Sequence, residues 1–139
     1  MDILEIYLTQ HRKYNSKELI DILETKINIT KNHVKHIKCT WIIFEVLTLF
    51  EKYGYIFTED DYKYIVGKYP FILERIPDDN KTYEICKIAV QKYGSMIQYI
   101  SDDKKTDEIC KIAVEQCNEA LKYVPNEIKI KLFQNIKIE

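Results

Sequence analysis

Apolar residues recur along this chain at the spacing of amphipathic helices, and in one stretch the whole pattern returns. The run Glu84–Val90 reads Glu-Ile-Cys-Lys-Ile-Ala-Val, and the same seven residues come back 24 positions later as Glu108–Val114. A weaker copy begins at Thr58, one such interval before Thr82. Self-similarity at a short fixed period is typical of proteins built from stacked structural repeats. The pattern therefore predicts three repeats over residues 58–125.

Each copy carries the signals that start and stop helices. A threonine stands at the expected N-cap, an acidic residue follows in the first turn, and a residue suited to a helix boundary comes later. These positions are Thr58, Thr82 and Thr106, then Asp60, Glu84 and Glu108, then Pro70, Gly94 and Asn118. Beyond each boundary, apolar residues at i, i+1 and i+4 predict a second, shorter helix. We therefore expect an all-α fold of small αα-hairpins, joined by the polar turns 77–81 and 101–105 and stacked as a short solenoid.

The repeated motif resembles a known family. The pattern Ile-Cys-x-x-Ala-Val, a helix break and then Leu-x-Tyr-Val-Pro is present in Ile109–Val114 and Leu121–Pro125. It is similar to the short tandem repeats of a domain-of-unknown-function family that is common in giant viruses of amoebae and also occurs in protists and bacteria. The resemblance covers residues 58–125, although Tyr62 replaces the cysteine and Arg75 replaces the tyrosine in the first copy. It implies helical repeats and carries no catalytic residues.

Residues 1–57 lack the repeat, and we expect them to form a helical N-terminal cap. A short helix from Asp2 to about Gln10 and a second helix capped by Ser16 are predicted there. The apolar residues assigned to the first of these helices are Ile3, Ile6 and Leu8.

A longer apolar run, Trp41–Phe50, is interrupted by Glu45 and is followed by Gly54 as a helix stop. A helix that is apolar almost all round is buried in a core or an interface, so a homodimer through this helix is the favoured assembly. At the other end, residues 126–139 predict a final helix that closes the stack with Ile128, Ile130, Leu132 and Phe133.

The composition argues against a function that depends on a strong overall charge. The chain has 139 residues, 31% of them charged, and a formal net charge of -1, so no global field attracts nucleic acid or membrane surfaces. Abundant isoleucine and lysine with scarce alanine and arginine indicate an AT-rich genome. The first residues do not have the basic and apolar segments of a secretory signal, so an intracellular location is expected, in the host cytoplasm or the virion if the source is viral.

The chain has four cysteines, Cys39, Cys86, Cys110 and Cys117, and none of them forms a CxxC pair. Cys86 and Cys110 hold the same repeat position within an apolar stripe, and we expect both to be buried and unreactive. A thiol enzyme would need a base and an orienting group that cannot both be named, so no catalytic activity and no cofactor are predicted.

His33, His36 and Cys39 follow one another at intervals of three, which would let two of them share a zinc ion if they lay on one helix. A fourth ligand is not evident. The alternative is a basic, exposed helix end whose cysteine faces the core, and we predict no metal.

Two groups of lysines are candidate anion sites. Lys63, Lys87 and Lys111 each follow an acid by three residues, which favours ion pairs along each helix. The segment Lys26 to Lys38 has no acidic residue, and it supports an alternative function as a nucleic-acid-binding helical module.

The favoured function is a protein-interaction or scaffolding module, because stacked helical hairpins present extended surfaces. Arg75, Tyr99 and Tyr123 occupy one repeat position, and Tyr and Arg are the residue types enriched at binding hot spots. They are the predicted partner-binding residues. The alternative, in which each tyrosine packs against the following turn, stays open.

Overall fold

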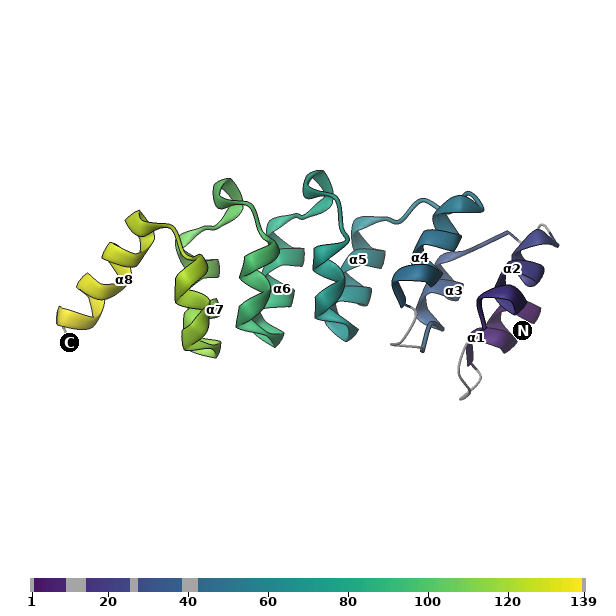
Figure 1. Ribbon diagram of the computed structural model, residues 1–139, viewed down its shortest axis with the longest axis horizontal. Helices are drawn as coiled ribbons and strands as arrows, with labels where there is room; N and C mark the ends of the chain where they lie inside the picture. The colour runs from purple at the N-terminus through teal and green to yellow at the C-terminus, as the bar shows by residue number, and fades with distance from the viewer. Residues whose placement is uncertain (1, 10–14, 26–27, 39–42, 139) are drawn as a thin grey trace. The chain divides into compact units, whose positions relative to one another are not determined.

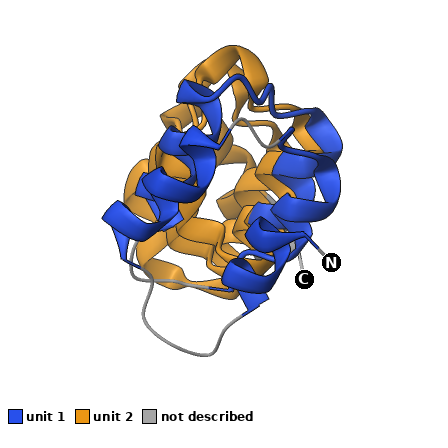
Figure 2. Cartoon of the chain, turned by 90° about the vertical axis from the view of Figure 1, so that its right-hand side faces the viewer, with its two compact units in different colours: residues 1–65 blue, residues 66–139 orange. Residues whose placement is uncertain are grey.

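The computed structural model describes residues 2–9, 15–25, 28–38 and 43–138, and every regular element in these ranges is a helix (Figure 1). The all-α prediction is therefore confirmed. None of the described helices is both long enough and apolar enough to cross a membrane. The chain divides into two compact units, Met1–Ile65 and Val66–Glu139, which Figure 2 shows in different colours.

The described residues of unit 1 form four helices and the start of a fifth. They are α1 (Ile3–Thr9), α2 (Ser16–Glu24), α3 (Lys31–Lys35), α4 (Ile43–Lys52) and α5 (Glu59–Lys68), and the boundary between the units falls within α5. α1 packs against both α2 and α3, and α2 packs against α4. The fully buried side chains of this unit include Leu4, Leu8, Leu19, Leu23, Ile43, Leu47 and Phe50.

Two details of the first helices differ from the expectations, because only Leu8 of the three apolar residues assigned to α1 is buried, and the N-cap of α2 is shifted by one residue. α1 turns Leu4, Tyr7 and Leu8 into the core, whereas Ile3 and Ile6 are exposed. Leu4, Tyr7 and Leu8 lie at i, i+3 and i+4, so they form one face, and α2 and α3 cover it.

The N-cap of α2 is Asn15, one residue before the predicted Ser16. Its side chain accepts hydrogen bonds from the backbone N–H groups of Lys17 and Glu18. Asparagine is as good an N-cap as serine, so the sequence signal was ambiguous by one position.

α4 is amphipathic. Ile43, Val46, Leu47, Leu49 and Phe50 are buried, while Glu45 and Thr48 are exposed and Phe44 is 38% exposed. Gly54 follows the helix with a φ of 96°, as expected for a glycine helix stop. Trp41 and Ile42 lie outside the described residues. Most of the apolar side chains of α4 are already buried within the chain, so the argument for a homodimer through this helix is weakened. The homodimer stays a prediction.

The start of α5 is held by a buried carboxylate. Asp61 Oδ2 accepts the backbone N–H of Thr58 at 3.0 Å and the hydroxyl of Tyr55 at 2.6 Å, and Thr58 Oγ1 accepts the N–H of Asp61 at 3.2 Å. This is a reciprocal cap, and it confirms Thr58 as a residue that starts a helix. Burial and the bond to Asp61 raise the pKa of Tyr55.

Unit 2 continues from α5 as an alternation of α-helices with short 3₁₀ helices. In chain order these are η1 (Pro70–Glu74), η2 (Asp78–Asn80), α6 (Tyr83–Lys92), η3 (Gly94–Tyr99), η4 (Asp102–Lys104), α7 (Asp107–Gln116), η5 (Asn118–Tyr123) and α8 (Asn126–Ile138). α6 packs against α7, and η3 packs against both η1 and η5. Unit 2 therefore has a row of α-helices beside a row of 3₁₀ helices.

The predicted starts of α6, α7, η1, η3 and η5 are confirmed, whereas η2 and η4 lie in segments that were expected to be polar turns. Thr82 and Thr106 cap α6 and α7 through their side chains, which accept the N–H groups of Ile85 and Ile109. The residues that were expected to mark helix breaks, Pro70, Gly94 and Asn118, are the first residues of η1, η3 and η5.

The second segment of each copy is a 3₁₀ helix, so the αα-hairpin prediction is corrected to an α-helix followed by a 3₁₀ helix. The ladder bonds run from i to i+3, as in Ile100 N–H to Ile97 O at 3.1 Å and Val124 N–H to Leu121 O at 3.1 Å. At five or six residues, these segments are longer than most 3₁₀ runs, which rarely exceed about three or four residues. The apolar positions still point inward, because Ile72, Leu73, Ile76, Ile97, Ile100, Ala120 and Val124 are all buried.

α8 confirms the predicted final helix but not its apolar contacts. Ile128 and Leu132 are only half-buried, and Ile130 and Phe133 are 57% and 48% exposed. α8 begins directly after Pro125, without the short 3₁₀ turn that precedes α6 and α7. The helix therefore leaves the pattern of the preceding elements, and half of its expected core residues face solvent.

Candidate partner-binding surface

Two buried lysines hold the backbone at the ends of η3 and η5. Lys81 donates from Nζ to the carbonyl oxygen of Tyr99 at 2.6 Å, and Lys105 donates to the carbonyl oxygen of Tyr123 at 2.7 Å. Each lysine also pairs with the aspartate three residues before it, at 3.1 Å for Lys81 and 2.9 Å for Lys105. Their side chains are only 7% and 8% exposed. The same contact therefore fixes both tyrosines at equivalent positions.

The predicted partner-binding residues all lie at the ends of 3₁₀ helices in unit 2. Arg75 is the C-cap of η1, Tyr99 ends η3, and Tyr123 ends η5. All three side chains are half-buried. The hydroxyl of Tyr123 lies 3.5 Å from Oε1 of Gln98, and the Lys122 ammonium lies 5.1 Å from the Tyr123 ring centre. The Tyr123 ring thus contacts its surroundings while part of its surface stays exposed, and the Tyr99 side chain is exposed to a similar degree. Both alternatives for the tyrosines stay open.

A glutamine joins the two α/3₁₀ pairs. The side chain of Gln116, at the end of α7, accepts the N–H of Gly94 at 2.6 Å and donates to the carbonyl oxygen of Lys92 at 3.0 Å. It satisfies the backbone groups left unpaired between α6 and η3. Gly94 itself lies so close to α7 that a Cβ there would be 2.2 Å from the carbonyl oxygen of Ala113. Gly94 was predicted only as a helix break, and no local sequence signal reports this packing.

The outer face of α6 and α7 carries a charged cluster. Lys87 Nζ lies 3.1 Å from Glu108 on α7, and the Tyr83 hydroxyl donates to the same carboxylate. The bond from Tyr83 and then the bond from Lys87 lower the pKa of Glu108, and the carboxylate raises the pKa of both partners. Lys87 therefore pairs across helices and not along its own helix with Glu84, as the spacing had suggested. The predicted pairing of Lys87 with Glu84 on its own helix fails because Glu108 on the neighbouring helix α7 also lies within reach of the lysine.

The lysine at the equivalent position of α5 also departs from the predicted pairing. Lys63 lies 3.5 Å from Glu59, at i, i+4, while Asp60 pairs with Lys31 at 3.4 Å. Lys31 belongs to the basic segment proposed for nucleic acid, so part of that segment's charge is already compensated. Lys26 lies outside the described residues.

The repeat cysteines are buried as predicted. Cys86 and Cys110 are at most 1% exposed, whereas Cys117 is half-buried, and Cys39 lies outside the described residues. Burial raises the pKa of the Cys86 thiol, and it raises that of Cys110 to about 11. At neutral pH both therefore remain thiols, which are poor nucleophiles.

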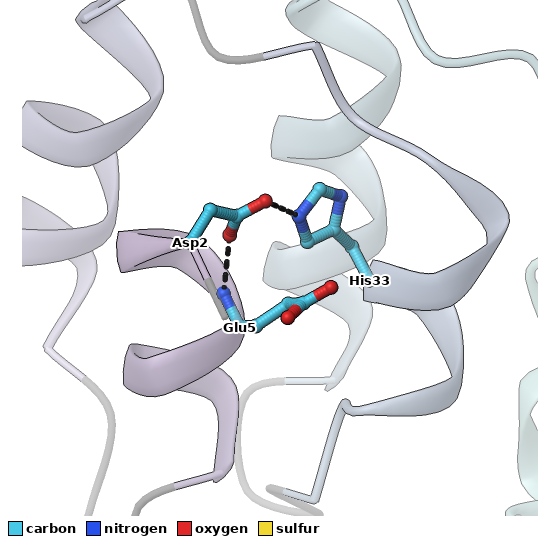
Figure 3. A group of neighbouring side chains, drawn as sticks. All are labelled: Asp2, Glu5 and His33. Atoms are coloured by element: carbon cyan, nitrogen blue, oxygen red, sulfur yellow. Dashed lines mark hydrogen bonds and ion pairs between the residues drawn. The ribbon is translucent and has the colours of Figure 1, made fainter.

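A polar cluster in unit 1 joins α1 to α3 (Figure 3). Asp2 Oδ1 accepts the N–H of Glu5 at 2.8 Å, and Asp2 Oδ2 lies 2.7 Å from Nε2 of His33, which is 1% exposed. The hydrogen bond from Glu5 lowers the pKa of Asp2, and the contact with His33 adds to this. Asn32 donates to the Glu5 carboxylate from the same side. Asp2, Glu5 and His33 thus lie close enough together to be tested as a metal site.

The hydrogen bonds of His33 do not fit a metal ligand. Nδ1 accepts the backbone N–H of Thr30 at 2.8 Å, so the proton of the neutral ring must be on Nε2, where it is donated to Asp2. If a metal were bound to Nε2, the ring proton would have to be on Nδ1. It would then point at the Thr30 N–H, so that two donors would face each other. The arrangement is that of a hydrogen-bonded contact between two helices.

The histidines are also not arranged as the sequence had suggested. α3 ends at Lys35, so His36 is its C-cap, and the Nδ1 atom of His36 donates to the carbonyl oxygen of Asn32 at 2.7 Å. The idea that His33, His36 and Cys39 share one helix face therefore fails for the two histidines. Sequence reasoning missed Asp2 and Glu5, which lie about 30 positions from His33 and become neighbours only through the packing of α1 on α3.

Comparison with known proteins gives one similarity. A family model described as a domain of unknown function (DUF4116) matches residues 82–129, which run from the N-cap of α6 into the first turn of α8. This is less than half of the chain. No curated protein and no solved structure matches the sequence.

Proposed function

We propose that unit 2 is a short stack of helical repeats that binds a partner protein through the ends of its 3₁₀ helices. The observation that carries this proposal is the repeated lysine contact, in which Lys81 and Lys105 hold the backbone of Tyr99 and Tyr123 in the same way. A recurring surface on a rigid backbone suits binding, because little conformational entropy is lost when a partner docks.

The surface proposed for the partner consists of Arg75, Tyr99 and Tyr123. Half-buried tyrosines offer large apolar area with a polar end, and guanidinium groups bind carboxylates in two-point contacts. Under this proposal the protein is a scaffold without catalytic activity. The resemblance to the repeats of giant viruses belongs to the same proposal, under which the protein would act inside an infected cell or a virion.

Affinity capture from the native or infected host cells tests the proposal. The bait is the full chain, compared with a Tyr99→Ala, Tyr123→Ala variant and with Tyr93→Ala as a matched control. Tyr93 lies in the same unit and is 55% exposed, but it is outside the proposed surface. We expect the double variant to lose proteins that both the wild type and the control capture, with an unchanged melting temperature.

One outcome contradicts the proposal, and another transfers the test to Arg75. If the double variant folds normally and captures the same proteins, the surface is not used. If the double variant melts at a much lower temperature, the tyrosines are structural, and Arg75→Ala then becomes the deciding variant, since capture unaffected by it removes the remaining member of the surface.

A further inference from the structure

Two helices expose apolar pairs of the same spacing. On α1, Ile3 and Ile6 are 56% and 47% exposed, and on α8, Ile130 and Phe133 are 57% and 48% exposed. Within each pair the residues are three positions apart, so they lie on one face of their helix. Large apolar side chains that remain half exposed in pairs mark surfaces that gain from being covered.

The two apolar pairs carry opposite charges at the same position. Asp2 precedes Ile3 and lies four residues before Ile6, and Lys129 precedes Ile130 and lies four residues before Phe133. In sequence, the start of α1 therefore reads acid, Ile, Ile and α8 reads Lys, Ile, Phe with identical spacing, although Asp2 directly precedes α1 and its carboxylate bonds to His33. The Asp2 side chain is 45% exposed, although it bonds to His33 and to the N–H of Glu5. These contacts do not neutralise the Asp2 carboxylate, because the neutral His33 ring and the Glu5 amide are uncharged hydrogen-bond donors.

We infer that the α8 patch, defined as Lys129, Ile130 and Phe133, binds the α1 patch of a second copy of the chain, defined as Asp2, Ile3 and Ile6. With the two helices parallel, Asp2 of one copy lies opposite Lys129 of the other, and the apolar pairs meet. A contact between unlike patches is head-to-tail, so each copy retains a free α1 patch or a free α8 patch, and assembly can continue.

The size of the patches limits the strength of this contact. α1 has seven residues, so it is about 10 Å long, and a helix is about 10 Å wide. The facing area is far below the roughly 800 Å² per partner of a standard stable interface. The association is therefore weak, and it depends strongly on concentration. It involves neither α4 nor the surface of Arg75, Tyr99 and Tyr123, so it stands apart from the proposed function.

Sedimentation velocity on the full chain over a concentration series tests the inference. The wild type is expected to increase in mean mass with concentration. The variants Ile3→Glu, Ile6→Glu and Ile130→Glu, Phe133→Glu are each expected to remain monomeric with an unchanged helical circular dichroism spectrum. Ile56→Glu is the matched control, since Ile56 is 83% exposed and outside both patches, and it should associate like the wild type.

Mixing the two double variants separates a head-to-tail contact from a symmetric one. The first variant retains an intact α8 patch and the second retains an intact α1 patch, so the mixture should form a dimer of one copy of each and grow no further. Wild-type protein that remains monomeric at its highest soluble concentration overturns the inference. So does association that the variants leave unchanged, or a mixture that stays monomeric.

Discussion

Lys105 lies in a turn whose sequence, Ser-Asp-Asp-Lys-Lys, indicates full exposure to solvent, yet its ammonium group is buried against the end of the next 3₁₀ helix. Its two neighbours in the turn, Asp103 and Lys104, differ from it in accessibility and partner. The Ser101 side chain lowers the pKa of Asp103, and Lys104 donates to the carbonyl oxygen of Asp78. Residue type alone does not distinguish these roles, because lysine is normally a surface residue.

Replacing Lys105 with Met should destabilise unit 2. The variant retains the aliphatic chain and loses the charged hydrogen bond to the Tyr123 carbonyl oxygen, a type of bond that contributes about 1.5–3 kcal/mol. The free energy of unfolding in urea measures the effect. Lys92→Met is the control, with an exposed side chain in the same unit and an expected change within about 0.5 kcal/mol. Equal effects of the two substitutions would mean that the buried contact contributes nothing.

The thiols should differ in reactivity. Burial raises the pKa of Cys86 and Cys110, so at neutral pH both should react with iodoacetamide much more slowly than the half-buried Cys117. Peptide mass spectrometry after timed labelling of the native protein follows each site separately. Urea should remove the difference. Rapid labelling of Cys86 and Cys110 in the native protein would show that unit 2 opens often enough to expose them.

At the scale of elements, the spacing between α6–η3 and α7 depends on Gly94. A Cβ at this position would meet the Ala113 carbonyl oxygen at 2.2 Å, a backbone atom that cannot move away without shifting α7. Gly94→Ala should therefore destabilise the protein by about 1–3 kcal/mol or more. Thermal melting followed by circular dichroism measures the change.

Gly67 provides the matched control for Gly94. It lies within α5, and a Cβ there would meet only Ile88 Cγ2 at 4.0 Å, an ordinary contact. Gly67→Ala should leave stability unchanged or raise it by up to about 1 kcal/mol, because alanine favours the helix. A Gly94→Ala variant that melts at the wild-type temperature would contradict the close packing of α7.

The contact between α1 and α3 should respond to acid. The pKa of Asp2 is lowered in the folded protein from its ordinary value of 3.8, so ionised Asp2 stabilises the fold above that pH, and the contribution is lost as the pH falls through the folded pKa. The stability difference between wild type and Asp2→Ala should thus be constant near neutral pH and shrink below about pH 4.

Asp21→Ala is the control for this pH series, since Asp21 is an exposed acid of α2 within the same unit. Urea unfolding at several pH values gives both differences. A wild-type advantage over Asp2→Ala that persists unchanged to the lowest pH would show that the Asp2 carboxylate is not stabilised in its ionised form.

For the whole molecule, charge argues against nucleic acid as the partner. The formal net charge is -1, and Lys31 of the basic segment is paired with Asp60. We expect no shift of duplex DNA or single-stranded RNA in a gel at low ionic strength. A shift that disappears as salt rises would instead support the nucleic-acid-binding alternative, because release of counterions makes such binding strongly salt-dependent.

The sequence by itself determined where the main helical segments of unit 2 begin, though not that the second segments are 3₁₀ helices, because helix starts and stops depend on residues close together in the chain. Thr82, Gly94 and Thr106 mark boundaries through local capping and backbone preferences, and the apolar period assigns the buried positions. Only the tertiary structure decided which polar groups meet. Lys87 with Glu108, Lys105 with the Tyr123 carbonyl oxygen, and Asp2 with His33 each join different elements. A side chain reaches several Å in any direction, so its partner depends on how helices pack, and spacing along one helix does not report that packing.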